Sequence, residues 1–516
     1  MLKEFRFQLL NLSPLKRTRG INMKLTLLPL DSRPCTYNIP RQLAECCAVQ
    51  VNQPPADIMD YYKESSDFEA ISQWLYDHSA CDDMVISIDQ LVYGGLLASR
   101  SMTVDTESAC KRLAVIQKIK LRHREIKIRI YNVIMRTTVS TLEKADQIWW
   151  ELVAEYSQVC TCHDNQESIR RRHQLETVIP PQVLAAFLAA RRRNHQVNME
   201  AVKLVALGAA EELILLQEDS APNGMHKAEQ TALLDLAKKL GIAHKVYLHC
   251  GTDEAAAALV GKVISLQGES QKYLGLEWLG GEKKEFTARY EDRPFSENLT
   301  AYLQTCQVTP VSPDAAKTVM VIYAPKKEQQ DLAIHSALAK VSYTTEELEM
   351  FCDRIAALLQ AGKQVALLDI HYANGGEGVF IQLLSRKGLL HLLTGYAGWN
   401  TACNSLGTLL GQLLCLPWAD PSQNRAFTCL RLLDDWLYQA VVRRQLNDRL
   451  KEIGEDDWNI QNKAAADVLL NQLMHHAPEL KMLGKILEPI GDFQARLEWP
   501  RTFECSVLFK NEGETI

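Results

Sequence analysis

Short, uninterrupted apolar runs recur along the chain and constrain its fold more than any other feature. A strand of a parallel sheet is covered on both faces, so it reads as a continuous apolar stretch rather than an alternating one. Segments with helical periodicity, such as residues 345–362, separate the runs. We predict strands at residues 25–30, 84–88, 128–134, 213–216, 246–248, 319–323, 365–368 and 390–393. The alternation of strands and helices predicts an α/β protein with a mainly parallel sheet.

Eight strands with intervening helices are typical of a (β/α)8 TIM-like barrel, and we favour this architecture. In such a barrel the polar residues at the carboxyl ends of the strands converge on one mouth. The alternative is a doubly wound parallel sheet in two lobes. Two further short runs, at residues 49–52 and 286–290, keep this alternative open, because a barrel must treat them as additions.

The chain divides into three predicted regions. Residues 1–22 lack an apolar block followed by a cleavage site, so we predict an N-terminal tail or an upstream extension of the natural start. Residues 23–418 are the predicted α/β catalytic domain, with a helical insertion at about 140–204 that is too long for an ordinary connection. The strand pattern then stops, and residues 419–516 are predicted as a C-terminal helical region. No internal repeat is visible in the sequence.

The composition restricts the classes of partner. A net charge of -6 and a pI near 6.2 argue against general nucleic-acid binding and against attraction to an anionic membrane. No stretch approaches the roughly 18 apolar residues that a membrane-spanning helix requires. The 14 cysteines are scattered, many within apolar helical patterns, as is typical of reduced thiols. We therefore expect a cytoplasmic protein that binds a small molecule or an oligosaccharide, with a homo-oligomer left open.

Polar side chains directly follow most of the apolar runs. A carboxylate beside a buried strand is unfavourable unless it is paired, hydrogen-bonded or used. Several of them at one end of the strands predict a polar cavity, although any one alone can equally well cap the next helix. The predicted substrate-binding residues are Asp31, Arg33, Asp89, Tyr93, Arg100, Arg136, Asp253, Asp369, Asn374, Trp399 and Asn400.

The predicted catalytic residues are Glu218 and Asp219, which follow the fourth run. Adjacent carboxylates repel each other, so one should have a raised pKa while the other stays ionised. Such a pair supplies an acid and a base at neutral pH. The alternative is a solvated turn, because Ala221–Pro222–Asn223–Gly224 ends the segment at once. Trp399 beside Asn400 is a second indication, since a ring and an amide can hold a sugar; a core tryptophan with a helix-capping asparagine is the alternative.

Several motifs occur together: PLDSRP, SIDQLVYGGLLASR, QEDSAPNGMHK, YEDRPFSENL, GYAGWNTACNSLG and LEWPRTFE. Together they resemble the bacterial domain-of-unknown-function family 4127 over nearly the whole chain from Met23. That resemblance implies a coherent fold but no activity. More loosely, adjacent carboxylates after a fourth barrel strand resemble those of hexosaminidase-like glycosidases that use substrate assistance. This second resemblance implies that Asp219 protonates the leaving oxygen and Glu218 orients a 2-acetamido group.

The leading hypothesis is a glycoside hydrolase that acts on a small amino-sugar substrate and needs no cofactor or metal. A first rival is a metal-dependent hydrolase or lyase with ligands from Asp31, Asp89, His249, Asp253 and Asp369. A second rival is a non-catalytic sugar-binding protein in which the carboxylates only hydrogen-bond to hydroxyl groups.

Overall fold

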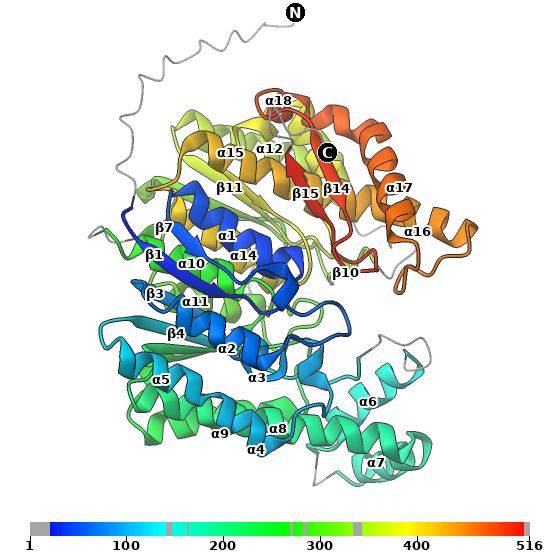
Figure 1. Ribbon diagram of the computed structural model, residues 1–516. Coiled ribbons are helices and arrows are strands. Elements are labelled where there is room, and N and C mark those ends of the chain that lie inside the picture. The colour runs from blue at the N-terminus through cyan, green and yellow to red at the C-terminus, as the bar shows by residue number, and fades with distance from the viewer. Residues whose placement is uncertain are drawn as a thin grey trace, which may run out of the picture.

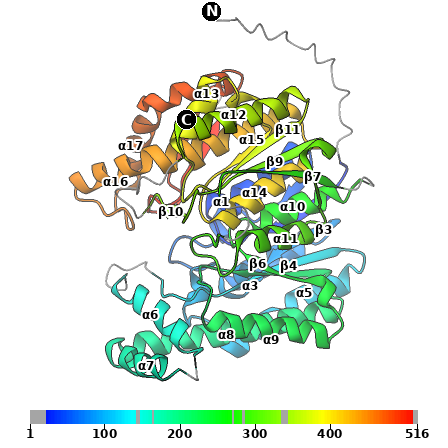
Figure 2. The same ribbon diagram turned by 180° about the vertical axis from the view of Figure 1, so that it is seen from behind.

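A computed structural model describes residues 21–140, 147–162, 165–268, 272–281, 286–333 and 343–509. The predicted N-terminal tail, residues 1–22, lies almost entirely outside the described residues. Figures 1 and 2 show a mixed α/β molecule with a large parallel sheet in each of two stacked halves. The predicted α/β class is therefore confirmed, and we refer to the halves as the first and second lobes. No helix within the described ranges is both long and apolar enough to cross a membrane.

The first lobe contains a six-stranded parallel sheet with the order β2-β1-β3-β4-β5-β6. Its strands are β1 (Lys24–Leu28), β2 (Gln50–Asn52), β3 (Asp83–Ser87), β4 (Lys127–Ile134), β5 (Glu212–Gln217) and β6 (Val246–Cys250). Alternate strand residues point to opposite faces, so Leu213 packs on one face and Ile214 on the other.

Helices cover both faces of the first sheet. One face carries α2 (Phe68–Asp77), α3 (Ile88–Tyr93), α4 (Thr106–Arg112), α5 (Ala114–Arg122), α8 (Pro181–Ala206) and α9 (Met225–Lys239). The other face carries α1 (Pro34–Cys46) and α10 (Ala255–Ser265). Because both faces are buried, the strands could appear in the sequence as continuous apolar runs.

The second lobe contains a five-stranded parallel sheet with the order β13-β11-β9-β7-β8. Its strands are β7 (Tyr273–Leu279), β8 (Thr309–Val311), β9 (Thr318–Tyr323), β11 (Gln364–Asp369) and β13 (Gly395–Ala397). The helices on its two faces are α12 (Thr345–Gln360) and α13 (Gly378–Arg386) on one, and α11 (Phe295–Thr305) and α14 (Ala402–Cys415) on the other. When the five strands are numbered 1 to 5 by their order in the chain, their order across the sheet, starting from β8, is 2-1-3-4-5. The first five strands of the other sheet have the same order. The topology repeats although the sequence shows no repeat.

The strands do not form the closed (β/α)8 barrel that we favoured. Within the described residues they divide between two open sheets, which corresponds to the alternative of parallel sheets in two lobes. The eighth predicted strand, at residues 390–393, is wrong: Leu390–Leu392 is a 3-10 helix, and β13 follows at Gly395–Ala397. A short apolar run does not by itself distinguish a strand from a helical turn.

The two additional runs have different outcomes. The run at residues 49–52 is confirmed as β2, whereas 286–290 contributes only an isolated bridge from Thr287 to Pro294. Strands β7 and β8 were not predicted. The β7 segment YLGLEWL contains a glycine and a glutamate and is only half buried, so it lacks the continuous apolar pattern.

The two lobes are joined by helices that pack backbone to backbone. Helices α10 and α14 cross where a Cβ atom added to Gly261 would lie 2.5 Å from the carbonyl oxygen of Gly411. A Cβ atom added to Gly411 would lie 2.5 Å from the carbonyl oxygen of Ala257. Helix α1 packs against both helices. This close contact sets the distance between the two sheets and therefore the width of any site between them.

The remaining segments lie beside these lobes. The region predicted as a helical insertion contains α6 (Gln147–Val159), α7 (Gln166–Val178) and α8. After residue 418 the chain forms α15 (Pro421–Arg431), the π-helix η7 (Leu432–Val442), α16 (Arg443–Glu452), α17 (Lys463–His476) and α18 (Gly484–Leu487). It then adds an antiparallel pair, β14 (Phe493–Arg496) and β15 (Ser506–Phe509), so the C-terminal region is not purely helical. Two short parallel strands, β10 (Gln330–Asp331) and β12 (Tyr372–Ala373), pair beside the second sheet.

Candidate functional site

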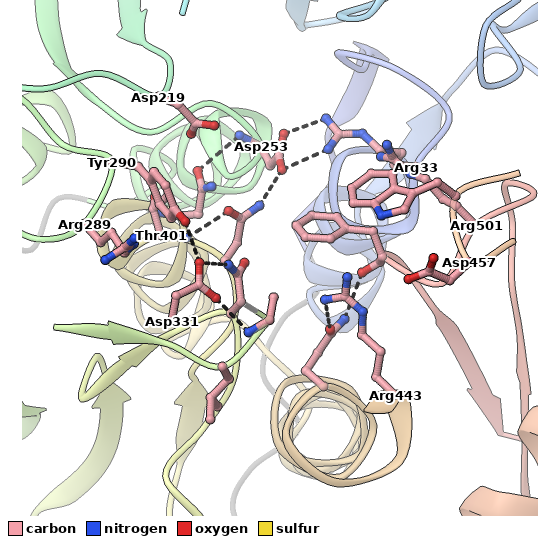
Figure 3. Close-up of a pocket in the computed structure, with 18 of the residues that line it drawn as sticks. Arg33, Asp219, Asp253, Arg289, Tyr290, Asp331, Thr401, Arg443, Asp457 and Arg501 are labelled. Carbon is pink, nitrogen blue, oxygen red and sulfur yellow. Dashed lines mark hydrogen bonds and ion pairs between the residues drawn. The ribbon is translucent and has the colours of Figure 1, made fainter. Parts of the chain in front are cut away.

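A cavity of about 1100 Å³ lies between the lobes. Its walls include the segments that follow β1, α3, β4, β5, β6 and β7, the loops that follow β12 and β13, and parts of η7, α16 and the segment before β15. Figure 3 shows these side chains converging from elements that are far apart in the sequence. In open parallel sheets ligands bind outside the carboxyl ends of the strands, so the position is typical of a ligand site.

The structure brings eight of the thirteen predicted site residues to this cavity. They are Arg33, Arg100, Arg136, Glu218, Asp219, Asp253, Asn374 and Asn400. The other five, which are Asp31, Asp89, Tyr93, Asp369 and Trp399, do not line it.

These five residues are buried and act as structural or supporting groups. Asp31 accepts hydrogen bonds from Arg33 Nε at 2.9 Å and from Arg33 Nη2 at 2.7 Å, so it orients a cavity residue from behind. The Asp89 carboxylate accepts from the backbone of β4, and the Asp369 carboxylate from the backbone at the start of α13. Burial raises the pKa of each of these two carboxyl groups to about 7.

The two aromatic residues among these five pack against other side chains and do not line the cavity. The Tyr93 ring lies 4.3 Å from the guanidinium carbon of Arg193. Trp399 packs against Phe503 and lines a separate cavity of about 20 Å³. It therefore does not offer its ring to a ligand in the large cavity.

The Glu218–Asp219 pair lies at the end of β5 and is held by two arginines. Arg100 Nη2 donates to Glu218 Oε1, and the backbone N–H of Arg136 donates to Glu218 Oε2 at 3.0 Å. Arg136 Nη2 donates to Asp219 Oδ2. The Glu218 side chain is only 5% exposed, whereas that of Asp219 is 31% exposed. Asp219 is therefore the member of the pair that a ligand can reach.

The two carboxyl groups have pKa values that move in opposite directions. Burial by itself raises both pKa values. For Glu218 the guanidinium groups of Arg100 and Arg136 outweigh burial and lower the pKa below its ordinary value. For Asp219 burial prevails over the opposing charge of Arg136, the charge of Glu218 acts in the same direction as burial, and the pKa is raised. The pair thus combines an ionised carboxylate, Glu218, with a carboxyl group, Asp219, that keeps its proton to a higher pH.

A second group of polar side chains surrounds Asp253, at the end of β6. Arg33 binds this carboxylate in a bidentate manner, from Nη2 to Oδ1 at 2.6 Å and from Nη1 to Oδ2 at 3.1 Å. Asn400 Nδ2 adds a hydrogen bond of 2.8 Å to Oδ2. Burial raises the pKa of Asp253, while Arg33 opposes this effect. Residues after β1, β6 and β13 meet here, so both lobes contribute.

A third group contains residues with a backbone conformation that is uncommon outside glycine. Tyr290, Asn374 and Asn400 have φ values of 70°, 63° and 71°, and all three line the cavity. The Tyr290 hydroxyl donates to Asp331 Oδ2 at 2.6 Å, and Asn374 Nδ2 donates to the same oxygen at 3.0 Å. Strained backbone of this kind clusters at functional sites, because the surrounding structure must hold it in place.

Several cavity residues were not predicted from the sequence. They include Arg289, Tyr290, Asp331, Gln439, Arg443, Trp458, Arg501 and Phe503. Tyr290 lies within YEDRPF and Arg501 within LEWPRTFE, so motifs that carry the family resemblance were the available signal. Gln439 comes from the π-helix η7, a rare element that is frequent at functional sites.

The five residues of the metal-dependent alternative are not grouped. Asp31 and Asp253 bind the guanidinium of Arg33, and His249 Nδ1 lies 2.9 Å from the carbonyl oxygen of Cys250. Over the described ranges no three His, Cys, Asp or Glu side chains are arranged to hold a metal ion. The donor geometry therefore does not support this set of metal ligands.

The pairing of Arg100 with Glu218 gives a test of the site's electrostatics. Replacing Arg100 by methionine leaves Glu218 Oε1 buried without that partner, so we expect the free energy of unfolding at pH 7 to fall by about 3 kcal/mol. The folded pKa of Glu218 is lowered, so its stabilisation is present above the unfolded pKa of about 4.3 and is lost as the pH falls. The difference between wild type and variant should therefore shrink below about pH 4.

Urea unfolding at pH 7 and at low pH measures this difference. Arg41→Met is the matched control, because Arg41 forms a more exposed ion pair with Glu45 on α1. An Arg100→Met variant that was no less stable than the control at pH 7 would contradict the described pairing.

A comparison with protein families shows what the chain is similar to. The model of the family described as "Protein of unknown function (DUF4127)" matches residues 25–508. This span includes both sheets and the C-terminal region, so every wall of the cavity lies within it. A comparison with curated proteins finds no match. The chain therefore belongs to the DUF4127 family.

Proposed function

We propose that the chain is a hydrolase of the glycosidase type, with its active site in the cavity between the lobes. The observation that carries this proposal is the position of Asp219, whose carboxyl group faces the cavity beside the buried, arginine-bound Glu218. Cleavage of a glycosidic bond requires an acid whose pKa is raised above that of an ordinary carboxyl group, and burial raises the pKa of Asp219. The polar lining, together with Trp458 and Tyr290, suits a hydroxyl-rich substrate.

In the proposed mechanism Asp219 donates a proton to the oxygen of the leaving group. Glu218 remains ionised behind it, and its negative charge helps to retain the proton on Asp219 until substrate binds. We assign the activation of water to Asp253, which Arg33 and Asn400 hold in a fixed orientation at the end of the neighbouring strand. General acid and base groups of this kind each contribute about 10²–10⁴-fold to the rate.

The analogy with substrate-assisted hexosaminidases loses its structural basis. It depended on a barrel, and the strands form two open sheets instead. It also assigned Glu218 to a 2-acetamido group, whereas Glu218 lies behind the more exposed Asp219 and is bound there by Arg100 and the backbone of Arg136. We therefore do not restrict the proposed substrate to amino sugars.

A panel of chromogenic glycosides tests the proposal. The panel should include neutral, 2-acetamido and acidic sugars in both anomeric forms, and hydrolysis should be followed from about pH 4 to pH 9. We expect at least one substrate to be turned over, with activity falling as the pH rises through the raised pKa of Asp219, because the acid then loses its proton. Binding of sugars without turnover of any of them would favour the non-catalytic alternative.

A further inference from the structure

Arg443 is a buried cation in the cavity wall whose bonding capacity is mostly unused. It begins α16, is 8% exposed and lines the cavity (Figure 3). Nη1 donates to Gln439 Oε1 at 3.3 Å, and the guanidinium carbon lies 4.6 Å from the centre of the Phe503 ring. Nε is buried and has no hydrogen-bond partner among the described residues.

The other buried arginines of the described chain are compensated. Their acceptors are Asp31 and Asp253 for Arg33, Asp83 and Glu212 for Arg129, Glu229 for Arg191, backbone carbonyls and Asn194 for Arg193, Asp434 and Asp435 for Arg431, and Glu504 for Arg501. Arg443 differs from the carboxylate-bound arginines because its one side-chain acceptor is a neutral amide. It also differs from Arg193, whose guanidinium makes five hydrogen bonds to neutral acceptors, because it makes only one within the described residues.

Carboxylates act on Arg443 only from a distance. Burial lowers its pKa, while Asp457, Glu504 and Asp331, together with Tyr438, oppose this effect electrostatically. Glu504 pairs with Arg33 and Arg501, and Asp331 accepts hydrogen bonds from Tyr290 and Asn374. Within the described residues no ion pair joins Arg443 to a carboxylate. A buried charge is unfavourable unless it is paired, so the free protein retains a cation that lacks a close counter-ion.

We propose that Arg443 binds an anionic group of the substrate. Its Nη2 atom donates to no described protein acceptor, whereas Nη1 is used by Gln439 and Nε is buried. Nη2 can therefore donate a charge-assisted hydrogen bond to an oxygen of a carboxylate or a phosphate in the cavity. Phe503 behind the guanidinium excludes water from one face and strengthens the interaction.

This inference rests on the proposed function, and it narrows the class of proposed substrate to acidic sugars. The carboxylate or phosphate of such a sugar would be the counter-ion of Arg443, and its hydroxyl groups would form hydrogen bonds with the other polar side chains of the cavity. The anion site itself does not depend on hydrolysis, so a binding measurement can test it even if no glycoside is cleaved.

The experiment compares three related probes: methyl glucoside, glucuronate and glucose 6-phosphate. Isothermal titration calorimetry measures their affinity for wild type, Arg443→Met, Arg443→Lys and the control Arg449→Met, whose arginine is 61% exposed on the same helix. We expect wild type and the control to bind one of the two anions at least about tenfold more tightly than the neutral sugar. Arg443→Met should lose that preference, and Arg443→Lys should retain only part of it, because an ammonium group keeps the charge but lacks the planar guanidinium that packs on Phe503.

Whichever anion binds more tightly identifies the group, since a preference for glucuronate indicates a carboxylate and one for glucose 6-phosphate a phosphate. Equal affinity of wild type for all three probes, or no binding of any, would overturn the proposal. An equal loss for all three in Arg443→Met would also overturn it, because it would indicate a merely structural role. The thermal unfolding temperature of Arg443→Met should be no lower than that of wild type, since the variant removes a poorly compensated buried charge.

Discussion

Replacing Asp219 by asparagine is expected to lower the rate of hydrolysis by about 10²–10⁴-fold while leaving the fold intact. Asparagine has nearly the same shape, but it has no acidic proton to donate to the leaving oxygen. Asp219 is the exposed member of the pair, so the loss of its charge is better tolerated than a change at the buried Glu218. Steady-state kinetics measure the effect, and we expect it in kcat rather than in KM.

Two further variants make this result specific. Asp235→Asn, on the exposed surface of α9, is the matched control and should keep the wild-type rate. A substrate whose leaving group needs no protonation should be cleaved by Asp219→Asn nearly as fast as by wild type, provided that its bond cleavage is rate-limiting. An unchanged rate for Asp219→Asn on ordinary glycosides would show that the general acid lies elsewhere.

Replacing Gly411 by alanine is expected to destabilise the protein by about 1–3 kcal/mol and to reduce activity at the same time. The added Cβ atom would lie 2.5 Å from the carbonyl oxygen of Ala257 in α10, and a backbone atom cannot move aside as a flexible side chain can. Helices α14 and α10 belong to different lobes, so they must separate and thereby alter the cavity between the sheets. Urea unfolding and the specific activity of the same preparation measure both effects.

Gly484→Ala is the matched control, because a Cβ atom at that position meets no atom within 4 Å. Its stability should be unchanged or slightly higher, since alanine reduces the freedom of the unfolded chain. A Gly411→Ala variant as stable as this control would be inconsistent with direct backbone contact between the lobes.

The α/β class and most of the buried strands could be predicted from the amino-acid sequence. Strands such as β4 and β9 are covered on both faces, so their positions appear as continuous apolar runs. The same runs located the residues at strand ends, which is why Glu218, Asp219 and Asp253 could be selected as candidates. A buried strand must be apolar, whichever strand lies beside it.

The grouping of the strands into sheets, and the set of polar residues that lie together, depend on long-range packing and could not be predicted from the sequence. The apolar pattern of a strand does not specify which strand pairs with it, so one barrel and two sheets have the same sequence pattern. Strand β7 was not predicted because it is only half buried. Arg443 and Tyr290 reach the cavity through the π-helix boundary and a left-handed backbone turn, neither of which has a periodic pattern. Long-range packing, above all the contact of α10 with α14, brings these segments together.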